Sequence, residues 1–148
     1  RGGVQIPIDD YTKVEILAPN SNKYENLNNY SAVVKISHGN TSFLFMGDAE
    51  KDSEEELLAY GYDLRADVLK VGHHGSNSSS TEEFLQAVSP KYAIISVGKD
   101  NEYGHPHEET LKRLSKHNAT VFTTADNGTI RIISDGKNIT IYSVKSKY

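Results

Sequence analysis

The sequence predicts an α/β fold with a mixed β-sheet. Three observations support this: the chain begins with β-rich segments, continues with strands that alternate with helical patterns, and ends in a β-hairpin signal. Its 148 residues suit one domain with a buried core, and no shift in composition marks a second one. We therefore expect residues 1–148 to form a single domain.

The first third of the chain is predicted to be mainly β-structure. Strands are expected over three apolar segments, residues 14–17, 32–36 and 43–46. A polar, asparagine-rich loop occupies residues 20–30, and His38-Gly39-Asn40 is typical of a hairpin turn. Ser53 and Glu56 form a capping-box pattern, which predicts a helix from about residue 53 that Gly61 ends.

The remaining elements alternate between strand and helix before a final hairpin. Buried strands are expected over residues 68–71, which are apolar apart from Lys70, and over residues 92–97, with a further strand over 121–124. Between them, a second capping box at residues 80–83 opens a helix that Pro90 closes, and Pro106 opens one that Asn118 ends. Asp135-Gly136 predicts a hairpin between strands at residues 130–133 and 139–142.

Composition and charge exclude several classes of protein. The net charge of −4 gives no global basic field to attract nucleic acid, although a local basic patch remains compatible with it. No apolar run has the roughly 18 residues of a membrane span, and no signal peptide is visible. The chain has no cysteine, so any metal would be bound by nitrogen and oxygen. Because it begins with Arg1 rather than methionine, we expect an excised piece of a longer protein.

Ligand-capable residues follow two of the predicted strands directly. The apolar strand at 68–71 ends in His73-His74-Gly75-Ser76, and the strand at 43–46 ends in Gly47-Asp48. A carboxylate and an imidazole held at rigid strand ends predict a shared metal centre. The alternatives are that Asp48 caps the following helix and that the histidines only pack in a loop. Neighbouring residues on an extended backbone point to opposite faces, so we expect one histidine to enter the site and the other to orient a ligand or contact substrate.

A third cluster, Tyr103-Gly104-His105-Pro106-His107, follows the strand at 92–97. His105 is the candidate for binding a phosphate or carboxylate oxygen, or for acting as a general acid, while the alternative is that this segment merely begins a helix. Ser76 is the one serine of its loop that we assign a possible hydrogen bond to phosphate. Lys70 either reaches an anionic group or extends to solvent. His38 and His117 are expected to be structural.

Together these motifs resemble a known family. Asn29-x-Ser31, Phe43-Leu44-Phe45-Met46-Gly47-Asp48, Ala66-Asp67-Val68-Leu69-Lys70-Val71-Gly72-His73-His74-Gly75-Ser76 and Tyr103-Gly104-His105-Pro106 occur in one order. This series is similar to the C-terminal half of the metallo-β-lactamase-like domain attached to ComEC-type DNA internalisation and competence proteins. The resemblance extends from about residue 14 to residue 133.

The resemblance implies an αββα sandwich whose active site, at one edge of its sheets, holds two divalent metals, zinc or manganese. Asp48 then corresponds to the bridging aspartate, and His74, or else His73, to the last histidine ligand. His105 and Ser76 would stabilise charge on phosphate oxygens. The implied activity is a metal-dependent phosphodiesterase or nuclease acting on DNA during uptake, next to the membrane channel portion of the same bacterial protein.

The chain departs from the family in one respect. The His-x-(His/Asp)-x-Asp-His motif of the first half of the domain is absent from the sequence. We therefore expect half of a sandwich with helices on one face of a mixed sheet, weak or no metal binding, and no activity for this piece alone. The uncovered sheet face should drive dimerisation, domain swapping or aggregation. Two alternatives stay open: an ester or phosphocholine-type hydrolase of the same fold, and a non-catalytic module that docks a channel or partner.

Overall fold

The computed structural model describes residues 1–144, which form a seven-stranded sheet in the order β1-β2-β3-β4-β5-β6-β7 and a two-stranded sheet of β8 and β9. The strands are β1 (Val4–Pro7), β2 (Thr12–Ala18), β3 (Val33–His38), β4 (Thr41–Phe45), β5 (Val68–Lys70), β6 (Tyr92–Ile95), β7 (Thr120–Thr123), β8 (Thr129–Ser134) and β9 (Ile139–Val144). Strands β1 to β4 pair antiparallel and β4 to β7 pair parallel. The predicted α/β fold with a mixed sheet is confirmed.

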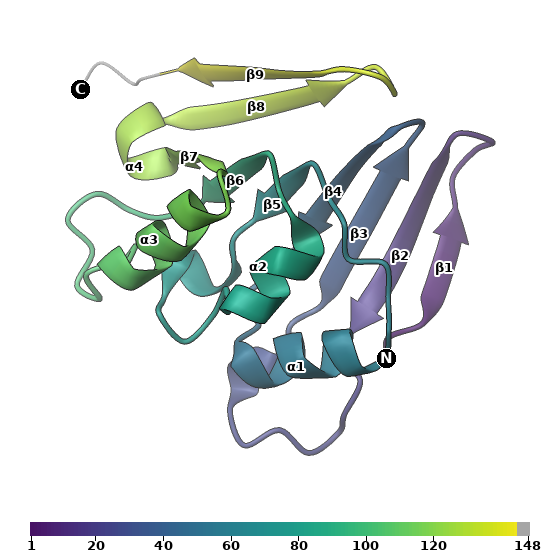
Figure 1. Cartoon of the computed structure of the whole chain (residues 1–148), viewed down its shortest axis with the longest axis horizontal. Helices are drawn as coiled ribbons and strands as arrows, with labels where there is room; N and C mark the ends of the chain where they lie inside the picture. Colours follow the sequence, from purple (N-terminus) through teal and green to yellow (C-terminus); the bar gives the residue numbers. More distant parts are fainter. Residues whose placement is uncertain (145–148) are drawn as a thin grey trace.

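Three helices connect the parallel strands and lie on one face of the large sheet (Figure 1). The helices are α1 (Lys51–Ala59), α2 (Glu82–Val88), α3 (Glu108–Lys116) and the single turn α4 (Thr124–Asn127), with 3-10 segments η1 (Leu27–Tyr30) and η2 (Gly72–Gly75). Leu44 pairs in register with Leu69, and Leu69 pairs in register with Ala93. All three side chains have no exposed surface and belong to the core beneath the helices. Within residues 1–144, none of these helices has the length and apolar character needed to cross a bilayer.

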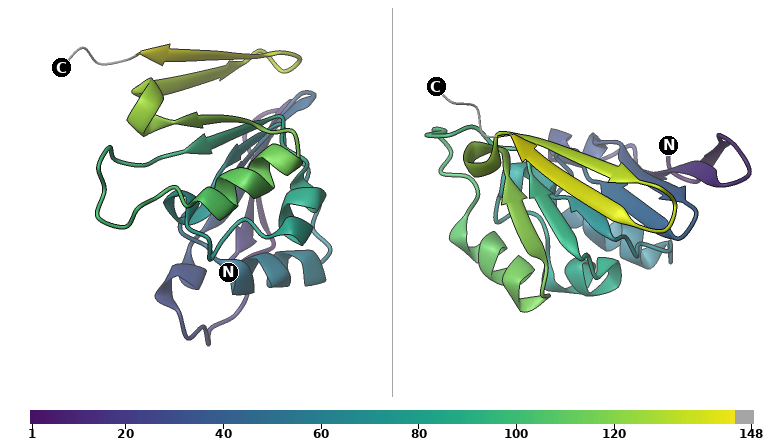
Figure 2. Two further views of the ribbon diagram at one scale, coloured as in Figure 1. Left: turned by 60° about the vertical axis from the view of Figure 1, so that its left-hand side comes forward. Right: turned by 90° about the horizontal axis from the view of Figure 1, so that it is seen from above.

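The opposite face of the sheet is also apolar, but it is only partly covered. Register places Val4, Ile16, Val34 and Phe45 in one row across β1 to β4, and side chains in register share a face. Val4 and Phe45 are 47% and 40% exposed. The β8–β9 hairpin crosses the strands at an angle (Figure 2) and brings Ile130 and Ile132 over part of this face. A cavity of about 280 Å³ remains between them, lined by Phe43, Phe45, Val68, Lys70, Ile94, Ile130 and Ile132.

Two elements were not predicted, and both are weak in sequence. Strand β1 is an edge strand of four exposed residues that includes Pro7, and proline is tolerated at an edge because no ladder donor is needed there. Helix α4 is one turn, which begins where Thr123 Oγ1 accepts the N–H of Asp126 at 3.0 Å. The predicted hairpin is confirmed, with the Asp135 carboxylate accepting the N–H groups of Lys137 and Asn138 across its turn.

Both predicted capping boxes are wrong in detail. Helix α1 begins at Lys51, so Ser53 lies inside it, and the Ser53 hydroxyl is buried with no partner among the described residues. The N-terminal N–H groups are instead capped from outside, since Asn29 Oδ1 accepts from Glu50 N at 2.9 Å and Ser53 N at 3.3 Å. In helix α2 the cap is Thr81, one residue later than predicted. A tertiary contact has replaced the local pattern at the start of α1, whereas α2 keeps a local cap, in which Thr81 Oγ1 accepts the N–H of Phe84.

Candidate functional site

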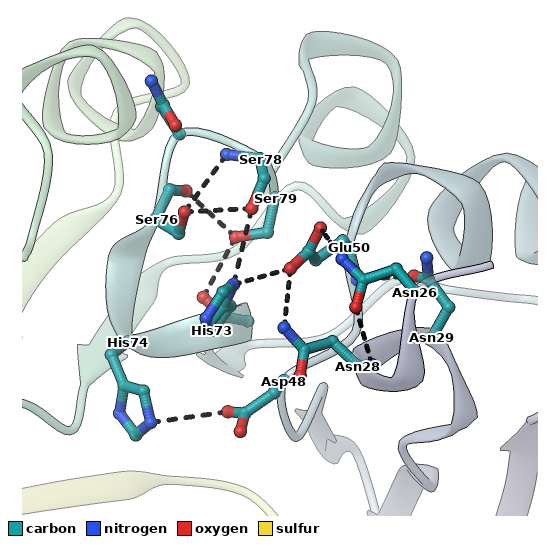
Figure 3. A network of polar contacts seen from close by, with 12 residues as sticks. Asn26, Asn28, Asn29, Asp48, Glu50, His73, His74, Ser76, Ser78 and Ser79 are labelled. Carbon is teal, nitrogen blue, oxygen red and sulfur yellow. Dashed lines mark hydrogen bonds and ion pairs between the residues drawn. The ribbon is translucent and has the colours of Figure 1, made fainter. Parts of the chain in front are cut away.

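Three loops that carry candidate residues meet at one edge of the sheet. Strands β4, β5 and β6 are parallel neighbours, so their carboxyl ends lie side by side. Asp48 follows β4, His73 and His74 follow β5, and the loop with His105 follows β6. This topology, rather than proximity in sequence, brings Asp48 together with His73 and His74 (Figure 3).

Asp48 and His74 form an accessible carboxylate–imidazole pair. Asp48 Oδ1 lies 3.5 Å from His74 Nε2, and the two side chains are 45% and 47% exposed. His74 Nδ1 lies 2.6 Å from the carbonyl oxygen of Ser96. A carbonyl can only accept, so Nδ1 carries the proton and the lone pair of the neutral ring lies on Nε2, towards Asp48. That orientation is the one a metal ligand requires.

The backbone of the histidine pair is left-handed, not extended as predicted. His73 and His74 have φ values of 43° and 53° within η2. The expectation that they point to opposite faces is therefore wrong, because it assumed a strand conformation. Their ring centroids are 6.3 Å apart and both face the loop after β4. The tight turn presents two imidazoles to one loop at the same time.

His73 contacts Glu50, a residue that the sequence analysis did not single out. Glu50 Oε1 lies 2.8 Å from His73 Nδ1, and the Glu50 side chain is only 13% exposed. Asn28 and Asn26 donate side-chain N–H groups to its two carboxylate oxygens at 2.7 and 3.0 Å. The asparagine-rich segment predicted to be a loop thus holds a half-buried carboxylate against His73 (Figure 3).

His105 lies beside His73 in a row of aromatic rings. Its ring centroid is 5.5 Å from that of His73, 4.7 Å from that of His107 and 5.7 Å from that of Tyr103. Burial, and then the neighbouring His107, His73 and His74, hold the pKa of His105 below its ordinary value. The imidazole is accordingly neutral near pH 7. His107 Nδ1 accepts the N–H of Asn77 at 3.0 Å, so His107 also ties this loop to the one after β5.

Ser76 supports the site from inside its loop. It is 5% exposed, and its hydroxyl lies 2.9 Å from that of Ser78, which in turn lies 3.4 Å from His73 Nδ1. Its carbonyl oxygen accepts the hydroxyls of Thr110 and Ser79. Among the residues that the structure describes, the Ser76 hydroxyl is thus linked to His73 through Ser78.

Lys70 and Ser31 fix the loop that carries Asp48. Lys70 Nζ donates to the carbonyl oxygen of Gly47 at 2.8 Å, which directs its ammonium group at this loop. Burial lowers the pKa of Lys70, against the opposing effect of Asp48. The Ser31 hydroxyl accepts the N–H of Asp48 at 3.0 Å, and His73 N donates to Gly47 at 3.2 Å. The loops after β4 and β5 are thus bonded to each other.

The two histidines expected to be structural lie away from this cluster. His38 Nδ1 is 2.7 Å from the hydroxyl of Thr12 on the neighbouring strand β2. His117 Nε2 is 2.9 Å from the carboxylate of Glu82, which joins the end of α3 to the start of α2. Both rings are accounted for by contacts that stabilise the fold.

Gly72 is needed for the close approach of the two loops. A methyl group at this position would lie 2.7 Å from the carbonyl oxygen of Ala49, a backbone atom that cannot move aside alone. We expect Gly72→Ala to lower the free energy of unfolding by about 1–3 kcal/mol through overpacking. Urea denaturation would measure this. Gly98→Ala is the control, because a methyl group there meets nothing within 4 Å; equal losses for both variants would contradict the proposed contact.

Comparison with known proteins identifies the family. The metallo-beta-lactamase superfamily matches residues 20–99, which is more than half of the chain. The chain belongs to the metallo-beta-lactamase superfamily. The matched segment contains β3 to β6 and both carboxylate–imidazole pairs, while His105 lies beyond its end.

Two of three curated relatives of this superfamily chain are named for competence or recombination. ComE operon protein 3 of Bacillus subtilis is 45% identical over 116 residues, covering 78% of this chain and 15% of the relative. Competence protein ComA of Neisseria gonorrhoeae is 38% identical over 123 residues, covering 82% and 18%. Recombination protein 2 of Haemophilus influenzae is 34% identical over 134 residues, covering 90% and 17%. The chain thus spans less than a fifth of each relative.

Membership of the superfamily implies metal ions, and the donors present fit such a centre only in part. Asp48 and His74 offer the oxygen and nitrogen donors that zinc and manganese accept, with the imidazole in the required tautomer. Within residues 1–144, however, no group of three or more such side chains is arranged to hold a metal ion. A catalytic zinc normally has three protein ligands, so the remaining donors would have to come from elsewhere.

Proposed function

We propose that this chain is the second half of a metal-dependent hydrolase domain that cleaves phosphodiester bonds of DNA during uptake. The observation that carries the proposal is the Asp48–His74 pair at the shared edge of β4 and β5, accessible and fixed in the tautomer that a metal requires. The relatives named for competence and recombination support the DNA context.

Asp48 and His74 would hold divalent metal, zinc or manganese, together with donors from a preceding segment of the same polypeptide. When bound, two such metals supply a water that is deprotonated near neutral pH. The short coverage of the relatives is consistent with further donors outside this chain. By itself, the chain should then bind metal weakly, because two protein donors are fewer than a stable site needs.

His105 is proposed to contact the phosphate. It lies next to His73 in the same loop cluster, and an imidazole carries an N–H that can donate to a non-bridging phosphate oxygen. Ser76 would help indirectly, by holding Ser78 and so the turn that carries the histidines. In this arrangement the chain provides one metal-binding edge and the adjacent phosphate contact.

The apolar sheet face supports the half-domain interpretation. Val4, Ile6 and Phe45 are each at least 40% exposed on the side opposite the helices, and the β8–β9 hairpin covers only part of it. Contiguous apolar surface of this kind marks a face that packs against something. We propose that the preceding half of the domain covers it in the longer polypeptide, and that two copies of this chain associate through it when that half is absent.

The test is hydrolysis by the full-length polypeptide that contains this chain. We expect cleavage of single-stranded DNA that a chelator abolishes and added manganese or zinc restores. Parallel assays with a carboxylic ester and a phosphocholine substrate distinguish the alternative hydrolase activities. If added metal restores cleavage of either of these two substrates while the DNA stays uncleaved, the assignment of DNA as the substrate is overturned. If no substrate is hydrolysed in a metal-dependent way, a non-catalytic interaction module is favoured.

A further inference from the structure

A second carboxylate–imidazole pair stands beside Asp48 and His74, and it is more enclosed. The Glu50 side chain is 13% exposed and that of His73 is 26% exposed, compared with 45% and 47% for Asp48 and His74. Glu50 Oε1 is 2.8 Å from His73 Nδ1. The Ser78 hydroxyl, which can donate or accept, lies 3.4 Å from the same nitrogen. An ionised carboxylate can only accept, so the closer Glu50 contact favours the proton on Nδ1 and the lone pair of the neutral ring on Nε2.

Glu50 lies at the start of helix α1, but its carboxylate does not cap that helix. Glu50 occupies the N-cap position of α1, yet its side chain makes no capping hydrogen bond. The capping oxygen comes from Asn29 Oδ1, which accepts the N–H groups of Glu50 and Ser53. A carboxylate at a helix start ordinarily accepts from that helix. Here it is turned away from its own helix, towards His73.

The η1 segment and its N-cap hold Glu50 in this orientation. Asn28 Nδ2 donates to Oε1 at 2.7 Å and Asn26 Nδ2 donates to Oε2 at 3.0 Å. With its backbone N–H bonded to Asn29, Glu50 is fixed by three asparagines of one segment. Orienting partners of this kind fix the tautomer and plane of an imidazole that binds a metal or a substrate.

We infer that Glu50 is a positioning residue that holds His73 as its Nδ1–H tautomer, so that the Nε2 lone pair is presented to the site. The ring centroid of His105, the proposed phosphate-contacting residue, lies 5.5 Å from that of His73. The inference rests on the proposed function in one respect, which is the identity of the group that His73 Nε2 would contact. The tautomer itself follows from the Glu50 contact.

The test reads the ring nitrogens directly. Long-range ¹H–¹⁵N NMR spectra of this chain would be recorded at mildly alkaline pH. We expect wild-type His73 to show one tautomer, with the unprotonated nitrogen at Nε2. Glu50→Ala should give a mixture of both tautomers at His73. Glu50→Gln should restore the single tautomer, because its amide oxygen still accepts from Nδ1.

His74 provides the internal control, since the carbonyl of Ser96 should hold its tautomer in every variant. Glu55→Ala, which removes an exposed glutamate of the same helix, should leave His73 unchanged. If Glu50→Ala does not fold, the wild-type and Gln spectra still decide, because an Nε2–H tautomer in wild type overturns the inference. An unchanged His73 tautomer in a folded Glu50→Ala variant also overturns the inference.

A kinetic comparison tests the consequence for the site. In the full-length polypeptide, Glu50→Ala should lower kcat for metal-dependent hydrolysis by about 10- to 100-fold, with most activity restored in Glu50→Gln. An unchanged kcat in Glu50→Ala would overturn the positioning role. If the wild-type polypeptide hydrolyses no substrate, the proposed function fails while the NMR result still decides the role of Glu50.

Discussion

Replacing Glu54 by alanine should lower the free energy of unfolding by about 3–5 kcal/mol, the range found when one partner of a buried charged network is removed. Glu54 lies in α1 with no exposed surface. Its carboxylate accepts Ser80 N at 2.5 Å, Thr81 N at 2.9 Å and Thr81 Oγ1 at 2.8 Å. Alanine would leave these donors buried without an acceptor, at about 1–3 kcal/mol for each group left unpaired.

The same glutamate connects α1 to the loop behind the histidines. Arg113 from α3 lies close enough to Glu54 to lower its pKa, and it donates to the carbonyl oxygen of Ser79 at 2.9 Å. Loss of the carboxylate would therefore leave a positive charge without its balancing partner beneath the loop after β5. We expect the variant to lose order in this loop before it loses the sheet.

Urea denaturation followed by circular dichroism would measure the effect, with Glu55→Ala as the control. Glu55 is exposed and, within residues 1–144, its recorded partner is exposed Lys51, so its removal should change stability by less than about 0.5 kcal/mol. Burial raises the pKa of Glu54 despite the opposing hydrogen bonds from Thr81 and Ser80. The pKa of Glu54 in the folded protein therefore lies above its unfolded value of about 4.3. The stabilisation that follows from this difference is fully present below about pH 4.3 and is lost as the pH rises through the folded pKa. The excess stability of wild type over Glu54→Gln should shrink over the same rise in pH. If Glu54→Ala lowers the free energy of unfolding by less than about 1 kcal/mol, the proposed role of Glu54 as the shared acceptor of the Ser80 and Thr81 donors is contradicted.

The sequence was sufficient to predict that the candidate residues lie together, because topology follows from pattern. Apolar runs that end in Gly47-Asp48 and in His73-His74 were interpreted as buried strands, and a helix between two such strands implies a parallel pair. The carboxyl ends of a parallel pair share an edge, so Asp48 and the histidines had to lie near each other. The β1 edge strand and helix α4 are too short to leave a periodic signal.

The internal geometry of the site was less predictable, since it depends on contacts between distant segments. Left-handed backbone is uncommon outside glycine, so nothing local indicated that His73 and His74 form a tight turn. Glu50 is adjacent to a helix start, where a glutamate ordinarily suggests favourable dipole interactions rather than a bond to an imidazole. The asparagines that hold it are more than 20 positions away. Their enrichment in residues 20–30 was the available signal, and it was interpreted as a loop by composition.

In the full-length polypeptide, Asp48→Ala should reduce metal-dependent hydrolysis by at least about 100-fold, because loss of a proposed direct ligand should exceed the 10- to 100-fold cost of losing an outer partner. His74→Ala should have an effect of similar size. Asp48 is 45% exposed, and among the described residues its carboxylate pairs with His74. Its removal should therefore change stability by less than about 0.5 kcal/mol, so a loss of activity would not reflect unfolding.

The double variant gives the more discriminating result. If Asp48 and His74 act through one centre, the combined Asp48→Ala/His74→Ala change should cost little more than either single change, because residues that act as a unit are non-additive. Independent roles would instead multiply the two losses. Asp52→Ala is the matched control, since this exposed aspartate lies on α1 with only a 3.4 Å contact to Asn29 and should retain near wild-type activity. Full activity in Asp48→Ala would place the metal centre elsewhere, because a carboxylate at the end of β4 would then have no part in it.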